Sequence, residues 1–441
     1  MKVLQVLNHF LPQQTAGTEV YAWALSKYLQ QNNIEVEVVI PRYGKKVSAT
    51  YIYNSLPVFQ YAEPSVVDRS LIMGLCKPEG LKEFTAHVQK ELPDIVHFHE
   101  LAGSNGITLH HVKAAKASGA KVLMTFHLAG YTCRTGTLLY KNKIPCNGLI
   151  DVKNCSACYC SNKGMFSVIN ALLPVSSLLH KAGINSTSWS NRAGTALGTY
   201  YIQEKLKKDF DLLIQNCDHV VVLTNWYKKV LLLNGVDKKK ITFIPQAIPL
   251  NNNLLPYHSG EKTARLKLVF LGRIHPLKGL HILIKAIKHL PEQKVSLDIY
   301  GQKSGKEYER YWRNKTSRNK NIKWKGQLKQ EEVVPTLSAY DALCLCSTFS
   351  EMSPLVIQEA FAAGIPVIAS NVNGNAEQVI DGENGWLFRF KDIVDLKKKI
   401  KSLIENPCLI ENAKLKIPAV KSFKTVTEEH IILYEKVLLG F

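Results

Sequence analysis

Residues 266–301 read LKLVFLGRIHPLKGLHILIKAIKHLPEQKVSLDIYG. The stretch contains two short segments with the character of strands, at 266–271 and 295–300, and each is followed by a glycine. Between them, residues 280–290 carry apolar side chains at the spacing of a helix. Two short apolar strands joined by a helix lie parallel in one sheet through a right-handed crossover. The stretch therefore predicts a strand–helix–strand unit of an α/β fold.

The same alternation extends in both directions from this unit. Apolar runs are predicted as strands, and many of the segments between them have helical spacing. The pattern predicts two doubly wound parallel sheets. The further strands are expected at 2–7, 36–40, 95–99, 121–126 and 219–223 in the first half and at 322–325, 342–346 and 366–369 in the second, with helices over 18–31 and around 107–117.

A chain of 441 residues exceeds what one hydrophobic core usually serves, which also favours two domains. We expect a first domain over residues 1–248 and a second over 249–424, joined near residues 245–262. A C-terminal helix within 425–441 is long enough to pack back on the first domain. Ligands of doubly wound sheets bind outside the carboxyl ends of the strands, so we expect two sheets that face a central cleft.

The composition narrows the classes of function. Hydrophobic residues make up 46% and charged residues 21%, as in a folded globular chain. The formal net charge of +20 indicates an anionic partner, which is nucleic acid, anionic lipid or a phosphorylated small molecule. The lysines are scattered through both halves without a nucleic-acid-binding motif. We therefore expect no nucleic acid partner.

The sequence predicts neither an export signal nor a membrane-spanning helix. The N-terminal apolar run is too short for a signal peptide, and no stretch of about 18 apolar residues occurs. Together with ten cysteines, this favours a cytoplasmic protein with reduced thiols. The apolar segment from Met165 to Leu179 is interrupted by Ser, Asn and Pro, and it is compatible with core packing or with a place on a membrane surface.

The strongest local signal is the stretch from Ser350 to Ala369, SEMSPLVIQEAFAAGIPVIA. It follows a predicted strand; Ser353 is suited to cap a helix, and Pro354 suits the first helical position. The N–H groups of Leu355 and Val356, at the positive end of the helix dipole, are then suited to bind a diphosphate.

Two glutamates frame this helix start, Glu351 before it and Glu359 inside it, with seven residues between them. Their carboxylates can accept hydrogen bonds from sugar and ribose hydroxyls respectively. This Glu-x7-Glu pattern, followed by Ala-x-Ala-x-Gly-x-Pro-Val-x-Ala, strongly resembles the retaining glycosyltransferases of family 4. The resemblance implies the GT-B fold, with two Rossmann-like domains, the first for an acceptor and the second for a nucleotide sugar.

Other segments extend the resemblance over nearly the whole chain. Residues 271–279 are similar to the family's Gly-Arg-x4-Lys-Gly loop, which implies that Arg273 and Lys278 hold the donor diphosphate. Two fixed cations there would stabilise the charge that grows on a leaving diphosphate. The turns that contain Gly301 and Leu328 resemble those that surround the nucleotide base in the family.

In the first half, residues 16–19 are similar to the family's Gly-Gly-x-Glu loop, which implies that the backbone at Gly17 approaches the donor phosphates or the acceptor. His127, which follows the predicted strand 121–126, matches a histidine that many relatives place beside the donor sugar. The chain departs from the family pattern at three positions, Ala16, Leu128 and Gln246.

Five cysteines crowd into one segment of the first half. Clustered thiols that include a Cys-x2-Cys pair indicate a structural zinc site, but buried and reduced thiols explain the same spacing equally well. The segment resembles a cysteine-rich insertion in a subset of the family, which would order a loop without taking part in the transfer. The expected zinc ligands are Cys133, Cys146, Cys155 and Cys158, with Cys160 as a further thiol.

The resemblance implies a retaining hexosyltransferase that moves a sugar from a nucleotide diphosphate sugar, expected to be a UDP-sugar, to a hydroxyl of a glycan or a lipid-linked acceptor. The implied catalytic residues are Glu351, His127, Arg273 and Lys278. No Asp-x-Asp pair is placed to bridge a metal and a diphosphate, so we expect no cofactor in catalysis.

The expected setting is polysaccharide or glycoconjugate biosynthesis for the cell envelope, with peripheral attachment to the inner face of an anionic membrane. Two alternatives stay open on the same fold. One is a nucleotide-sugar epimerase, and the other is an inactive nucleotide-sugar-binding protein.

Overall fold

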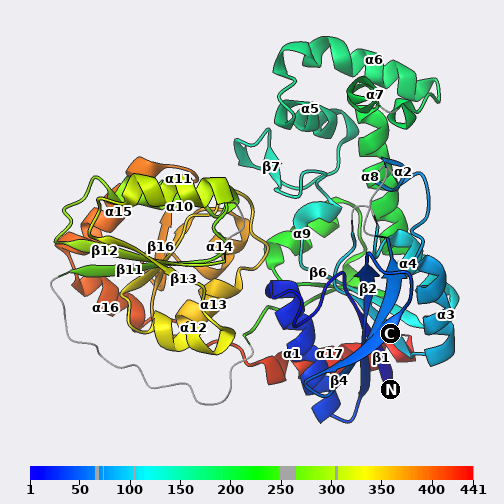
Figure 1. The fold of residues 1–441 in the computed structure, drawn as a ribbon, viewed down its shortest axis with the longest axis horizontal. Helices are drawn as coiled ribbons and strands as arrows, with labels where there is room; N and C mark the ends of the chain where they lie inside the picture. The colour runs from blue at the N-terminus through cyan, green and yellow to red at the C-terminus, as the bar shows by residue number, and fades with distance from the viewer. Residues whose placement is uncertain are drawn as a thin grey trace. The chain divides into compact units, whose positions relative to one another are not determined.

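The computed structural model describes residues 1–64, 69–72, 74–102, 105–189, 191–248, 265–302 and 306–440, without the side chains of Phe166 and Lys306. The chain forms two compact units, one of Met1–Pro245 with Phe423–Phe441 and the other of Gln246–Ser422. Most of the predicted junction at 245–262 lies outside the described residues. Figure 1 shows the helices and strands of each unit.

The first unit is built on an eight-stranded sheet with the strand order β10-β9-β6-β5-β1-β2-β4-β3. Strands β5, β6 and β9 consist almost wholly of buried residues, which is why they form unbroken apolar runs in the sequence. The strands are β1 (Lys2–Val6), β2 (Glu35–Tyr43), β3 (Ala49–Tyr53), β4 (Leu56–Glu63), β5 (Ile95–Phe98), β6 (Lys121–Phe126), β9 (His219–Val222) and β10 (Ile241–Phe243).

The C-terminal helix α17 (Phe423–Leu439) belongs to the first unit, where it packs against α1 (Gly17–Gln31). The rings of Tyr21 and Phe423 meet edge to face with their centroids 5.2 Å apart, which joins the two helices through apolar contact. The other helices around this sheet are α2 (Arg69–Ile72), α3 (Leu81–Glu91), α4 (Leu109–Ala117) and α9 (Asn225–Leu233).

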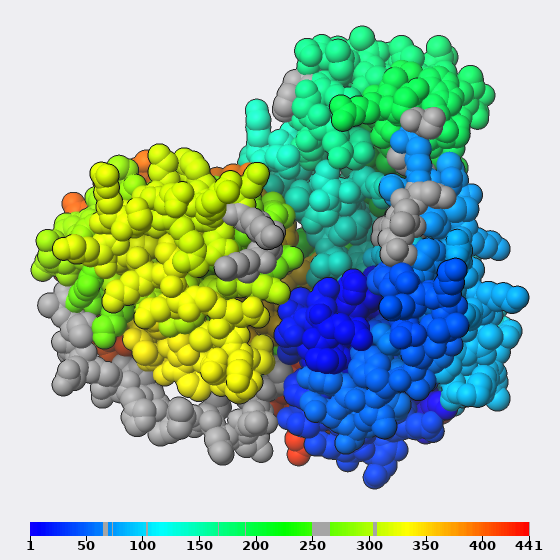
Figure 2. Space-filling model, viewed as in Figure 1, coloured from blue at the N-terminus to red at the C-terminus, as the bar shows by residue number. Residues whose placement is uncertain are grey.

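A helical insertion lies between β6 and β9. The long helix α8 (Thr199–Asn216) contacts α4 near the sheet, and α5 (Val152–Asn162), α6 (Ile169–Lys181) and α7 (Arg192–Leu197) also pack on it. In Figure 1 the last three lie beyond the sheet, and in Figure 2 they project from the rest of the first unit. A small hairpin of β7 (Leu139–Tyr140) and β8 (Ile144–Pro145) precedes them.

The second unit is built on a six-stranded sheet with the order β13-β12-β11-β14-β15-β16, in which every pair is parallel. Neighbouring residues of β11, such as Leu268 and Val269, belong to different apolar clusters, so both faces of the sheet are buried. The strands are β11 (Leu266–Leu271), β12 (Val295–Tyr300), β13 (Ile322–Gly326), β14 (Ala342–Leu345), β15 (Val367–Ser370) and β16 (Gly385–Phe388).

Helices follow most strands of this sheet, as expected of a doubly wound fold. They are α10 (Leu280–Ile287), α11 (Lys306–Thr316), α12 (Gln330–Leu337), α13 (Leu355–Ala362), α14 (Asn373–Gln378), α15 (Ile393–Glu405) and α16 (Cys408–Lys414).

The doubly wound α/β fold predicted from the sequence is confirmed, and β6, β11 and β12 have the predicted bounds. The predicted parallel pairing holds for the strands named from the sequence, and the unpredicted strand β3 adds one antiparallel pair, with β4, at the edge of the first sheet. The turn that joins them places Asn54 (φ 48) and Ser55 (φ 69) in the left-handed region, as a two-residue hairpin turn requires.

Candidate functional site

The helix predicted to bind a diphosphate is α13, and its start differs by one residue from the prediction. Pro354, rather than Ser353, is the N-cap: its backbone is extended (φ −68, ψ 117), and its carbonyl accepts the N–H of Ile357 at 3.2 Å. The first N–H groups of a helix have no carbonyl partner inside it. Those of Leu355 and Val356, with the helix dipole, therefore suit an anion as predicted.

Two of the predicted catalytic side chains, Lys278 and Glu351, are in direct contact. Lys278 Nζ lies 2.5 Å from Glu351 Oε1, and the hydroxyl of Ser347 donates to the same oxygen at 2.6 Å. Both members of the pair are largely buried, with side-chain exposures of 18% and 9%. The loops after β11 and β14 thus bring a cation and a carboxylate, 73 positions apart in the chain, to the same edge of the sheet.

The position of Lys278 depends on the glycine that follows it. Gly279 has a φ of 69, and a Cβ there would lie 1.7 Å from the carbonyl oxygen of Cys346. The N–H of Thr348 also donates to the carbonyl of Leu277 at 2.7 Å. The lysine loop therefore lies directly on the loop after β14, at a distance that only glycine allows.

Glu359 lies inside α13 and is buried, with 8% of its surface exposed. Burial raises the pKa of its carboxyl, and the hydrogen bond from Gln330 Nε2, 2.9 Å away, lowers it. Sequence reasoning missed Gln330, because nothing in its neighbourhood distinguishes it from any polar residue at a helix start. It also missed Asn373, whose amide donates to the hydroxyl of Ser350 at 2.9 Å.

The other predicted residues of the second unit lie in the loops after β11, β12 and β13. Arg273 is exposed, and Leu328 packs against an apolar cluster of the sheet. Gly301 donates its N–H to the carbonyl of Gly326 at 2.7 Å, and a Cβ on it would lie 1.8 Å from the carbonyl oxygen of Gly272. The turns around Gly301 are therefore packed backbone against backbone.

In the first unit, His127 follows β6 and is buried, with 8% of its surface exposed. Its Nε2 lies 3.1 Å from Nδ1 of His99, and its ring meets that of Tyr21 edge to face at 4.8 Å between centroids. Burial lowers the pKa of His127 to about 3, so the imidazole is neutral at pH 7.

His127 is the end of a buried polar network that reaches the C-terminal helix. His99 Nε2 is 2.6 Å from Gln5 Oε1, and His97 Nδ1 is 2.7 Å from the hydroxyl of Tyr434 on α17. Burial lowers the pKa values of His97 and His99 well below the ordinary value, so both rings are neutral at pH 7. The sequence gives no signal for this network, because its members come from strands and a helix far apart in the chain.

Gly17, the other predicted residue of this unit, is exposed and is the first residue of α1. Sequence reasoning missed the carboxyl of Glu100, which follows β5 and accepts the N–H of Asn8 at 3.0 Å. Burial raises the pKa of Glu100 to about 7, with a smaller contribution from Glu19. A glutamate side chain with a shifted pKa, placed just after the C-terminal end of a central strand, is a candidate for contact with a ligand.

The four cysteines named as zinc ligands line one cavity of about 490 Å³ beside α5. The Sγ of Cys158 accepts the N–H of Lys141 at 3.1 Å, and burial raises the pKa of Cys155 to about 11. Among the described residues, however, no three His, Cys, Asp or Glu side chains are arranged to hold a metal ion. The structure gathers the four thiols around one cavity, and zinc stays a prediction.

No helix in the described ranges combines the length and the apolar character that crossing a bilayer requires.

Two family models match separate parts of the chain. The sequence model of a family described as Glycosyl transferases group 1 matches residues 256–419, and that of Glycosyltransferase Family 4 matches residues 15–145. An uncharacterized glycosyltransferase of Methanocaldococcus jannaschii is 26% identical over 253 residues, which cover 54% of this chain and 63% of that protein. The chain spans less than two thirds of the length of the curated relatives that it matches.

Solved structures match along the full length. Sucrose-phosphate synthase from Thermosynechococcus elongatus has a TM-score of 0.70 at 17% identity and covers 100% of both chains. HepE from Anabaena, in complex with UDP and glucose, has a TM-score of 0.62 at 15% identity and covers 99% of both chains. Two glycosyltransferase models thus match separate parts of the chain, and its fold is the GT-B fold.

Proposed function

We propose that the chain transfers a sugar from a nucleotide diphosphate sugar to an acceptor hydroxyl, with retention of configuration and without a metal in the transfer step. UDP is the proposed nucleotide, which is supported by the similarity to HepE in complex with UDP and glucose. The observation that carries the proposal is the pair of Lys278 and Glu351 at the strand ends of the second unit.

The second unit supplies the groups that a nucleotide diphosphate sugar needs. Lys278, Arg273 and the N–H groups that start α13 would bind the diphosphate. The carboxylate of Glu351 would accept hydrogen bonds from the sugar hydroxyls. The buried carboxyl of Glu359 would accept from the ribose hydroxyls. Ser353 lies in the loop before the helix, and Gly301 and Leu328 lie in turns proposed to meet the base through backbone groups.

The same groups would promote bond breaking. Negative charge grows on the diphosphate as the glycosidic bond opens, and fixed cations with helix N–H groups stabilise that charge without a metal. The acceptor hydroxyl would attack the face that the diphosphate leaves, and the departing phosphate would take its proton. Neutral His127 of the first unit would bind a sugar hydroxyl in this step.

A glycan or lipid-linked acceptor in polysaccharide or glycoconjugate synthesis is the proposed partner of the first unit. Peripheral attachment to an anionic membrane is supported by the net charge of +20 and by the exposed apolar side chains of α6. Sedimentation with anionic vesicles at low salt, and not with neutral ones, is the expected result. Equal recovery with both kinds of vesicle would contradict the electrostatic part of this proposal.

The test of the transfer itself is a donor screen read by mass spectrometry. A set of nucleotide sugars is incubated with the chain, with and without a glycan or lipid-linked acceptor, and release of nucleoside diphosphate is measured. Acceptor-dependent release supports the proposal. Turnover to an isomeric nucleotide sugar without acceptor would instead identify an epimerase, and binding without turnover an inactive protein.

A further inference from the structure

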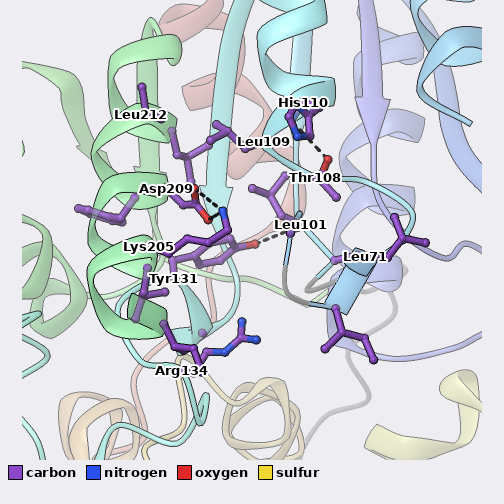
Figure 3. A pocket seen from close by; sticks show the side chains of 18 of the residues that line it. Leu71, Leu101, Thr108, Leu109, His110, Tyr131, Arg134, Lys205, Asp209 and Leu212 are labelled. Atoms are coloured by element: carbon purple, nitrogen blue, oxygen red, sulfur yellow. Dashed lines mark hydrogen bonds and ion pairs between the residues drawn. The ribbon is translucent and has the colours of Figure 1, made fainter. Parts of the chain in front are cut away.

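A second cavity of about 540 Å³ lies within the first unit, between α4, α8 and the loops that follow β5 and β6 (Figure 3). The loop after β5 contributes Leu101 and Ala102, and the loop after β6 contributes Leu128, Tyr131 and Arg134. Its volume is in the range of small-molecule sites, and it lies at the carboxyl ends of central strands, where doubly wound sheets bind ligands. None of the predicted site residues lines it apart from Cys133.

Much of the cavity wall is apolar. Leu128 keeps 47% and Ile72 keeps 43% of their surfaces exposed, so apolar area stays uncovered at this site. A concave apolar surface of this kind favours a ligand with an apolar part. The other aliphatic residues of the wall include Leu71, Leu101, Leu109, Leu206 and Leu213.

The charges around the same cavity favour an anion. Lys113, Arg134 and Lys205 line it against one carboxylate, Asp209, and that carboxylate is paired with Lys205 at 2.7 Å. Figure 3 shows this pair on α8, with Tyr131 and Arg134 below it and Leu71 on the other side of the view. Within the described ranges, the side chains of Arg134 and Lys113 have neither a hydrogen bond nor an ion pair.

The lysines gather around a neutral histidine. Burial lowers the pKa of His110, and the charges of Lys77, Lys113 and Lys205 lower it further, against the opposing effect of Asp209. Cations from the segment before α3, from α4 and from α8 are therefore close enough to act on one ring. An anion bound here would meet several cations at once.

We propose that this cavity binds the acceptor through a phosphate-bearing lipid headgroup, with Arg134 on the phosphate and the leucine wall on the chain. The inference rests on the proposed glycosyltransferase function and names the class of its acceptor. A guanidinium binds a phosphate through two parallel hydrogen bonds, and the aliphatic wall removes the first methylene groups from water. A free anion would leave the apolar wall uncovered, and a neutral glycolipid would leave Arg134 without an anionic partner.

The helical insertion supports a lipid source for the phosphate. On α6, Ala171, Val175 and Leu178 are exposed at intervals of four and three residues, which places them on one face of the helix. Leu178 alone keeps 68% of its surface exposed. The helix α6 packs on α8, and α8 lines the cavity, so one helix connects α6 with the cavity. An apolar face on a surface helix is suited to the interface of a membrane.

The test is a calorimetric titration of the full chain with three probes: octyl phosphate, inorganic phosphate and octyl glucoside. The variants are Arg134→Gln and Leu128→Ser, which change exposed side chains and so leave the core intact. The matched controls, Lys229→Gln and Leu232→Ser, remove an exposed lysine and an exposed leucine from α9. The titration contains no nucleotide sugar, so its result does not depend on whether transfer occurs.

Octyl phosphate is expected to bind at least about tenfold more tightly than either other probe, and each variant is expected to weaken it by about tenfold or more. Both controls should bind it like the unchanged chain. Equal binding of octyl phosphate by the unchanged chain and by either variant would overturn the proposal. Equal binding of inorganic phosphate would also overturn it, because it would show a site for a free anion. A failed donor screen with intact octyl phosphate binding would instead reject only the transferase function.

Discussion

Nε2 of His127 lies 3.1 Å from Nδ1 of His99, and the surrounding groups decide which nitrogen carries each proton. Gln5 turns its oxygen toward His99 Nε2 and its amide group toward the hydroxyl of Tyr434. His99 therefore donates through Nε2 and accepts at Nδ1, so His127 donates through Nε2. Its Nδ1 keeps a lone pair, which can accept a hydrogen bond from a hydroxyl.

The first prediction concerns the proton on His127. His99→Leu removes the acceptor that fixes the tautomer, and we expect kcat to fall by roughly ten- to a hundredfold with a smaller change in KM for the donor. His99→Asn keeps an oxygen near the position of Nδ1 and should recover part of the loss. Steady-state kinetics with both variants check this, with thermal unfolding to compare their folding. Equal losses of kcat in the two variants would show that the position matters for packing alone.

The second prediction concerns the ion pair of Lys278 and Glu351. Lys278→Ala and Glu351→Ala should each lower the rate of transfer by roughly two orders of magnitude or more, because each removes a contact to the charge or to the sugar in the transition state. Since the two side chains act on each other, the double variant should lose less than the product of the two single losses.

The matched control for this pair is Lys398→Ala, which removes an exposed lysine from α15 in the same unit. We expect it to keep a normal rate. Near-normal transfer by both single variants would reject the site in the second unit. Circular dichroism on each variant separates lost chemistry from lost structure, because the removal of one partner leaves a buried charge in the other.

The third prediction tests the contact that fixes the lysine loop. Gly279→Ala would place a Cβ 1.7 Å from the carbonyl oxygen of Cys346 and would strain a backbone with a φ of 69. We expect a loss of about 3–5 kcal/mol in the free energy of unfolding, measured in urea. The control is Gly382→Ala, at a φ of 79 with open space around the added Cβ. It introduces the backbone strain without a steric clash and should lower the free energy of unfolding by about 1–2 kcal/mol. Equal losses of stability in the two variants would show that the backbone at Cys346 moves aside at little cost.

The fourth prediction concerns the thiol cavity beside α5. If the thiols of Cys133, Cys146, Cys155 and Cys158 hold zinc, their ionisation is driven by the metal, because burial alone raises the pKa values of Cys155 and Cys158. Elemental analysis of the chain purified without chelator should then give one zinc per chain, and Cys155→Ser with Cys158→Ser should abolish it. A zinc content well below one per chain would contradict the prediction and would mean that the four cysteines are reduced thiols around a cavity.

The sequence predicted the fold well because central strands of both sheets are parallel and almost wholly buried, and their apolar runs need no partner to be recognised. Lys278 and Glu351 could be named as candidate site residues because both belong to local motifs at strand ends, and the structure brings the two side chains into contact. It could not predict Gln5, His99 or Tyr434, since their contacts depend on where three distant segments meet. The start of α13 was wrong by one residue, because Ser353 and Pro354 are both acceptable at a helix start and the choice depends on the packing of the loop.

Glu100 gives the chain a pH dependence that the sequence does not reveal. Burial raises the pKa of its carboxyl to about 7, and burial raises that of Glu63 to about 7 as well. A carboxyl with a higher pKa in the folded chain than in the unfolded chain binds its proton more tightly when folded. The stability that it contributes is therefore full below the unfolded value near 4.5 and is lost as the pH rises through 7.

The last prediction follows from this loss of stability with rising pH. The free energy of unfolding of the first unit should fall between pH 5 and pH 8, with contributions from Glu100 and Glu63 of about 1–3 kcal/mol each. Glu100→Gln keeps the shape and an oxygen that can accept the N–H of Asn8, but it cannot ionise. Urea unfolding at pH 5 and pH 8 should show a smaller loss for this variant than for the unchanged chain, and Glu63→Gln should reduce the loss by a similar amount. Identical losses in the unchanged chain and in Glu100→Gln would mean that the carboxyl of Glu100 ionises near its ordinary value, and that it is not a neutral group at the strand end near neutral pH.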